Sequence, residues 1–82
     1  MVTGAASGIG RSTAIRLARE RARLVLTDRD ADGLASVEQA CRDAGAPVLA
    51  AEALDITDHD AVLVFGERVI AAHGAPDAVF HV

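Results

Sequence analysis

The residues best suited to chemistry form the segment Thr3-Gly4-Ala5-Ala6-Ser7-Gly8-Ile9-Gly10. A glycine-rich turn at a helix start presents backbone N–H groups and a partial positive charge, so a phosphate or pyrophosphate is the expected ligand. The spacing of Gly4, Gly8 and Gly10 differs from G-x-G-x-x-G, but these glycines can likewise allow a tight turn, room for phosphates and close helix packing. The alternative is an ordinary glycine-rich loop. A P-loop is excluded because it needs Lys, which this chain lacks.

Asp28 ends a short apolar run and is the second candidate. Its carboxylate can accept hydrogen bonds from the 2′- and 3′-hydroxyls of an adenosine ribose and would repel a 2′-phosphate, which favours NAD over NADP. Alternatively, it is one of several acids before the next helix, together with Asp30 and Asp32. The neighbouring Arg29 can partly tolerate a 2′-phosphate, so dual specificity stays open.

Asp55 and Ile56 end the next apolar run. The carboxylate of Asp55 can hydrogen-bond to the adenine edge, and Ile56 can pack on the ring. The alternative role of Asp55 is to cap the helix that starts near Asp58.

Alternating apolar strands and amphipathic helices are expected to position these motifs. We predict strands at Met1–Thr3, Arg23–Asp28, Pro47–Leu54 and Asp77–Val82. The first predicted helix runs from Ile9 to Arg21, and the second runs from Asp30 or Ala31 to Ala44. The third is capped by Thr57, with Asp60 as the capping-box partner, and ends at Gly74 and Pro76. The predicted fold is α/β: β-α-β-α-β-α-β, part of a Rossmann-type doubly wound parallel sheet with strand order 3-2-1-4. The second and third strands are continuous apolar runs, typical of strands buried on both faces. All three motifs fall at the carboxyl ends of strands, where such sheets bind ligands.

Each predicted helix has an apolar face that we expect to pack in the core. The expected buried faces are Ala14, Leu17 and Ala18; Leu34, Val37, Cys41 and Ala44; and Val62, Phe65, Val69 and Ala72. Cys41 is therefore expected to be a small core residue. The three histidines lack the spacing of metal ligands, so no metal site is expected.

Composition excludes several classes of function. The net charge is −4 with no basic stripe, so nucleic acid is not an expected partner. No apolar run is long enough to span a membrane, and no signal peptide is evident. A single cysteine favours a reducing, cytoplasmic location.

The chain resembles the N-terminal third of a short-chain dehydrogenase/reductase, essentially from end to end. The motifs that carry the resemblance are Val2-Thr3-Gly4-Ala5-Ala6-Ser7-Gly8-Ile9-Gly10, Thr27-Asp28-Arg29 and Asp55-Ile56-Thr57. It implies NAD(P)-dependent oxidation of alcohols or reduction of carbonyls, with residues 1–82 forming the N-terminal fragment of one dinucleotide-binding domain. It also implies contacts to the cofactor diphosphate from Gly4, Ser7, Ile9 and Gly10, to ribose from Asp28, and to adenine from Asp55 and Ile56.

The chain departs from the family pattern at three places. His81 and Val82 stand where the family has the start of Asn-Asn-Ala-Gly, and Arg21 stands where a Gly often ends the first helix. The family's catalytic Ser and Tyr-x-x-x-Lys lie downstream, and no Tyr or Lys occurs here. No catalytic residue is therefore assigned, and the chain alone is predicted to be inactive. An alcohol or carbonyl substrate and a homo-oligomer are expected only for a full-length form.

Two other classes of function compete with this interpretation. One is a stand-alone nucleotide-binding or regulatory module without catalysis. The other is a methyltransferase-like domain, which is disfavoured because its usual Gly-x-Gly-x-Gly run is absent.

Overall fold

The structure is a computed structural model that describes residues 1–74 and the backbone of residues 80–81. Strands and helices alternate in the order β1 (Val2–Thr3), α1 (Gly8–Arg19), β2 (Leu24–Asp28), α2 (Ala31–Asp43), β3 (Val48–Ala53), α3 (His59–His73) and β4 (Phe80–His81). Most boundaries agree with the predicted ones within two residues. Of the predicted strand Asp77–Val82, only Phe80–His81 falls among the described residues, and Pro76 lies outside them.

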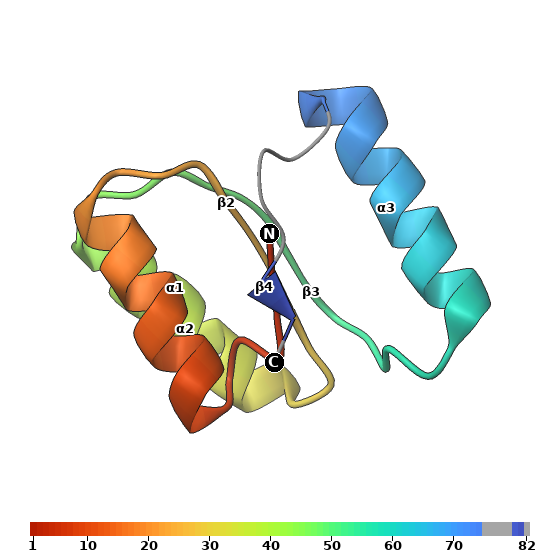
Figure 1. The fold of residues 1–82 in the computed structure, drawn as a ribbon, viewed down its shortest axis with the longest axis horizontal. Coiled ribbons are helices and arrows are strands. Elements are labelled where there is room, and N and C mark those ends of the chain that lie inside the picture. The colour runs from red at the N-terminus through yellow and green to blue at the C-terminus, as the bar shows by residue number, and fades with distance from the viewer. Residues whose placement is uncertain (75–79, 82) are drawn as a thin grey trace.

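The strands form a parallel sheet in the order β3-β2-β1-β4, which confirms the predicted doubly wound topology. Figure 1 shows α1 and α2 on one face of the sheet and α3 on the other. Right-handed crossovers explain this arrangement. The chain moves from β1 to β3 in one direction across the sheet and returns to β4 in the other, so the return crossover lies on the opposite face.

The larger core lies between the sheet and the pair α1 and α2. Its fully buried side chains include Leu24 and Leu26 of β2, and the predicted helix faces supply Ala14, Ala18, Leu34, Val37 and Cys41. Leu17 and Ala44 are partly buried against this core. The small alanines let α1 approach the sheet closely, which sets the position of its amino end.

The opposite face is covered more thinly. Val25 of β2 packs with Phe65 and Val69 of α3, while Ala72, which was predicted to share that face, is exposed. The prediction that β3 is buried on both faces is also wrong, because only Val48 is buried and the rest of the strand is half-buried or exposed. Within the described residues β3 lies at one edge of the sheet, and the polar Glu52 interrupts its apolar run.

Each helix begins at a side chain that accepts a hydrogen bond from the first turn. Ser7 caps α1, Asp30 caps α2 and Asp58 caps α3. The predicted cap at Thr57 is therefore wrong by one residue, and Asp60 lies in the first turn without forming a capping box with Thr57. Asp58 Oδ1 accepts from Ala61 N at 3.1 Å, which is the hydrogen bond that a capping residue makes to the third residue of its helix.

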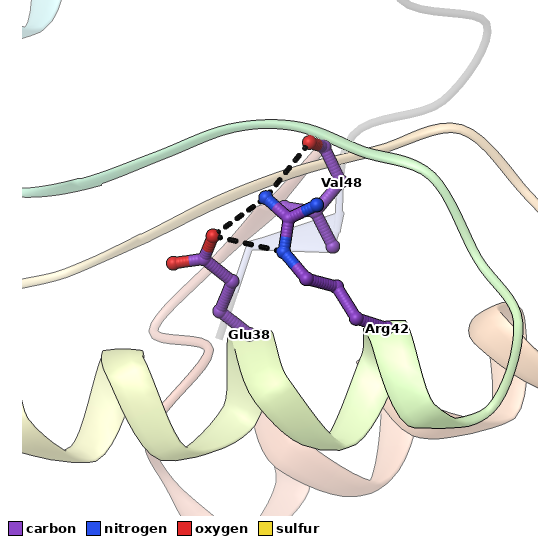
Figure 2. A network of polar contacts seen from close by, with 3 residues as sticks. All are labelled: Glu38, Arg42 and Val48. Atoms are coloured by element: carbon purple, nitrogen blue, oxygen red, sulfur yellow. Dashed lines mark hydrogen bonds and ion pairs between the residues drawn. The ribbon is translucent and has the colours of Figure 1, made fainter.

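Arg42 ties the carboxyl end of α2 to the start of β3, as Figure 2 shows. Its Nη2 donates to Glu38 Oε2 at 2.7 Å and to the Val48 carbonyl oxygen at 3.3 Å, while Nε donates to the same Glu38 oxygen at 3.2 Å. At the end of α1, Arg21 adopts φ 60°, a left-handed conformation that favours glycine. Across the described ranges, no helix has both the length and the apolar character needed to cross a membrane.

Candidate cofactor-binding site

The glycine-rich loop between β1 and α1 is closed by its own hydrogen bonds. Ser7 Oγ donates to the Gly4 carbonyl oxygen at 2.7 Å and accepts from Gly10 N at 3.1 Å. Gly4 has φ 66°, a conformation that favours glycine. A Cβ on Gly10 would stand 2.8 Å from the Gly4 carbonyl carbon and 3.0 Å from Ser7 Oγ. Gly4 and Gly10 are therefore required for the turn itself.

The loop leaves two backbone donors free at the amino end of α1. The N–H groups of Gly8 and Ile9 are the first two of the helix and have no acceptor within the described part of the chain. A Cβ on Gly8 would meet nothing within 4 Å, and the Ile9 side chain is 72% exposed. The helix therefore presents unpaired donors and its positive dipole end to open space.

Asp28, at the end of β2, is half-buried and accepts two backbone hydrogen bonds. Its Oδ2 accepts from Ala6 N and its Oδ1 from Asp30 N, both at 2.9 Å. The cap of α2 is Asp30, which accepts from Gly33 N at 3.0 Å, so Asp28 is not the helix cap. Each carboxylate oxygen has a second lone pair that remains available to a ligand hydroxyl.

Asp55, which follows β3, is exposed and held in a fixed orientation by Thr57. Its Oδ1 accepts from Thr57 N at 2.9 Å and from Thr57 Oγ1 at 2.8 Å. These bonds hold the pKa of Asp55 below its usual value, and the nearby Arg29 guanidinium lowers it further. Asp55 does not cap α3, because Asp58 is the capping residue of that helix.

The carboxyl ends of these strands lie around one cavity of about 450 Å³. It is lined by Gly4, Ser7, Asp28, Arg29, Leu54, Asp55, Ile56 and Thr57. Six of the residues predicted from the sequence thus meet at one place. The others do not line it: Gly8 and Ile9 are exposed at the start of α1, and Gly10 is buried beneath the loop.

Several contributors to this site were not predicted individually. Thr57 orients Asp55, and Leu54 adds apolar surface to the cavity. Ala6 bonds to Asp28, and Gly33 of α2 has no room for a side chain because a Cβ would lie 2.9 Å from the Ala6 Cβ. A glycine in the first turn of a helix is a detectable signal, since glycine lowers helix propensity and needs a packing reason there.

Other chemically interesting residues lie apart from this cavity. No group of His, Cys, Asp or Glu side chains within residues 1–74 is arranged to hold a metal ion. Cys41 is fully buried in the larger core, and this burial raises the pKa of its thiol, although Arg11 opposes the shift. The structure thus confirms its prediction as a core residue.

Known proteins resemble this chain in sequence and in fold. The sequence model of the family described as short chain dehydrogenase matches residues 1–81. The putative oxidoreductase SadH of Mycobacterium tuberculosis (strain CDC 1551 / Oshkosh) is 40% identical over 81 residues, which cover 99% of this chain and 29% of that protein.

Two crystal structures have the same architecture. A metagenomic short-chain oxidoreductase in complex with NADP is 41% identical with a TM-score of 0.85, and NAD+-bound xylitol dehydrogenase is 32% identical with a TM-score of 0.88. Both matches cover 95% of this chain, but only 35% and 30% of the respective structures. The chain thus spans about a third of these structures and less than a third of the SadH relative. From its sequence match and its fold, the chain belongs to the short-chain dehydrogenase/reductase family.

Proposed function

We propose that this chain is the N-terminal part of a dinucleotide-binding domain and holds the adenosine diphosphate portion of NAD. The observation that carries the proposal is the pair of unpaired N–H groups on Gly8 and Ile9, located at a helix start beside the cavity. This donor set suits a diphosphate, and the space next to Gly8 is open to receive one. The solved relatives bound to NADP and NAD+ support the proposal.

Different residues of the site bind different parts of the cofactor. Gly8 and Ile9 donate to the diphosphate, while Gly4, Ser7 and Gly10 keep the loop in the shape that exposes those donors. Asp28 accepts from the ribose hydroxyls through its remaining lone pairs. Asp55 and Ile56 form the adenine subsite, with Thr57 holding the Asp55 carboxylate in place.

The position of Asp28 favours NAD over NADP. A carboxylate at the end of β2 repels a 2′-phosphate, whereas it accepts hydrogen bonds from the unmodified ribose. Arg29 faces the same cavity, but its guanidinium lies close enough to Asp55 to lower the pKa of that carboxyl. The positive charge of Arg29 can attract a 2′-phosphate, so we expect some binding of NADP.

Isothermal calorimetry with NAD and NADP tests this assignment directly. We expect NAD to bind more tightly, and we expect Asp28→Ser to reduce the preference by about tenfold, the factor that 1.4 kcal/mol represents. Asp43→Ser is the matched control, because Asp43 is an exposed acid at the far end of α2 whose side chain accepts a hydrogen bond from Gln39. Tighter binding of NADP by the unmodified chain would overturn the proposed preference.

The whole protein is proposed to transfer a hydride between NAD(H) and an alcohol or carbonyl substrate. The cofactor, when bound, supplies the hydride chemistry, and the residues described here bind and orient its adenosine half. A proton donor for the substrate oxygen is also needed, and this chain contains no Tyr or Lys to act as the family's donor pair. The 82-residue chain alone is therefore expected to show no turnover with NAD and simple secondary alcohols.

We also propose that the whole protein acts on an alcohol or a carbonyl compound, forms a homo-oligomer and is located in the cytoplasm. The comparisons give no support to the alternative of a stand-alone regulatory module.

A further inference from the structure

The carboxylate of Asp28 lies between the glycine-rich loop and the start of α2. One oxygen accepts from Ala6 N in the loop, and the other accepts from Asp30 N at the helix cap. We propose that Asp28 is also a positioning residue: it fixes Ala6, and thereby orients the Gly8 and Ile9 N–H groups toward the cofactor diphosphate. This inference rests on the proposed function and assigns Asp28 a second role beside ribose binding.

The loop is attached to β2 by two consecutive hydrogen bonds. Ala5 N donates to the Thr27 carbonyl oxygen at 3.0 Å, which continues the pattern of a parallel ladder past the end of β1. Ala6 N, the next donor, is held by the Asp28 side chain at 2.9 Å. Ala6 is thus the last loop residue tied to the sheet before the chain turns at Ser7 into α1.

The first turn of α2 packs against Ala6 and also restrains it. Asp30 caps α2 through Gly33 N, and a Cβ on Gly33 would lie 2.5 Å from Asp30 Oδ2 and 2.9 Å from the Ala6 Cβ. The loop, the end of β2 and the first turn of α2 therefore meet without spare volume. Asp28 is the only side chain within residues 1–74 shown to hydrogen-bond to both the loop and the start of α2.

A dual role has a measurable consequence. Removing the Asp28 carboxylate should improve binding of any diphosphate if charge repulsion were its only effect, because a negative charge near the site is lost. If Asp28 holds the loop, its removal should instead weaken diphosphate binding, including that of ligands without ribose hydroxyls. The two effects have opposite signs.

Calorimetry with ADP and 2′,3′-dideoxy-ADP separates these effects. The dideoxy ligand keeps the adenine and the diphosphate but has no ribose hydroxyl for Asp28 to bind. We expect Asp28→Ser to weaken binding of dideoxy-ADP by about tenfold, because a hydrogen bond to a charged group is lost. Binding of ADP should weaken further, since the ribose contact is lost as well.

Two more variants test positioning rather than general stability. Asp28→Asn keeps a carbonyl oxygen that can accept from Ala6 N, so it should recover most of the affinity for dideoxy-ADP that Asp28→Ser loses. Gly33→Ala keeps the Asp28 carboxylate but displaces Ala6, so it should weaken NAD and NADP equally and leave their ratio unchanged. Asp43→Ser is again the matched control and should bind both ADP ligands as the unmodified chain does.

The possible outcomes distinguish this inference from the proposed function. If the unmodified chain binds neither ADP ligand, the proposed function fails and the positioning role fails with it. If it binds both and Asp28→Ser leaves dideoxy-ADP binding unchanged or tighter, the positioning role alone is overturned. Weakening of dideoxy-ADP in Asp28→Ser, with recovery in Asp28→Asn, supports the positioning role.

Discussion

Gly8→Val should abolish cofactor binding without unfolding the chain. A Cβ at Gly8 meets no atom within 4 Å, so a branched side chain fits the folded structure. Gly8 is also the first residue of α1, where valine has a slightly better helix propensity than glycine. We therefore expect the free energy of unfolding to change by no more than about 0.5 kcal/mol.

The expected loss of affinity follows from the two donors beside that position. Hydrogen bonds to a charged group contribute about 1.5 to 3 kcal/mol each. If the valine side chain keeps the diphosphate away from both Gly8 N and Ile9 N, about 3 to 6 kcal/mol is lost. This corresponds to a dissociation constant roughly 10²- to 10⁴-fold larger.

Calorimetry with NAD measures the affinity, and urea denaturation monitored by circular dichroism measures the stability. Gly66→Val is the matched control, because Gly66 of α3 also has nothing within 4 Å of an added Cβ and is far along the chain from the loop. The control should bind NAD normally. Unchanged NAD affinity in a folded Gly8→Val chain would refute the reasoning and make the loop purely structural.

Three further substitutions test local features of the fold and the site. Arg21→Gly should stabilise the chain by about 1 kcal/mol in urea denaturation, because Arg21 has φ 60° and glycine adopts that conformation without strain; no gain would contradict the strain argument. Gly10→Ala should destabilise it by about 1 to 3 kcal/mol, because the added Cβ collides with the Gly4 carbonyl; a melting temperature equal to that of the unmodified chain would exclude the clash. Thr57→Val should raise the pKa of Asp55 toward its ordinary value of 3.8, measured by carboxyl NMR titration, since one of its two hydrogen bonds is lost. Because the pKa of Asp55 in the folded chain lies below 3.8, ionised Asp55 stabilises the fold above pH 3.8, and this stabilisation is lost as the pH falls through the folded pKa. Thr57→Val should therefore make the free energy of unfolding less dependent on pH in this range.

The topology and most of the site could be predicted because they depend on local patterns. Alternating apolar strands and amphipathic helices predict a parallel sheet, and right-handed crossovers leave few possible strand orders. Once the strand order is known, the loops after β1, β2 and β3 must lie together at the carboxyl ends of the parallel strands. That is why Gly4, Asp28 and Asp55 line a single cavity although they are far apart in the sequence.

What could not be predicted depends on neighbours in space. The apolar run of β3 resembles that of β2, but their burial differs because β3 lies at an edge of the described sheet and β2 lies inside it. Thr57 and Asp58 are both good capping residues, and the choice between them depends on the Asp55–Thr57 hydrogen bonds. The hydrogen bond from Ala6 N to Asp28 joins two loops, and neither local sequence indicates it.

The central claim is that the start of α1 binds a dinucleotide diphosphate, and an NMR titration of the chain with NAD tests it most directly. We expect the backbone amide signals of Gly8 and Ile9 to move most strongly, with smaller changes at residues lining the cavity, such as Asp28 and Ile56. Shifts that saturate elsewhere while the Gly8 and Ile9 amides stay unchanged would contradict it.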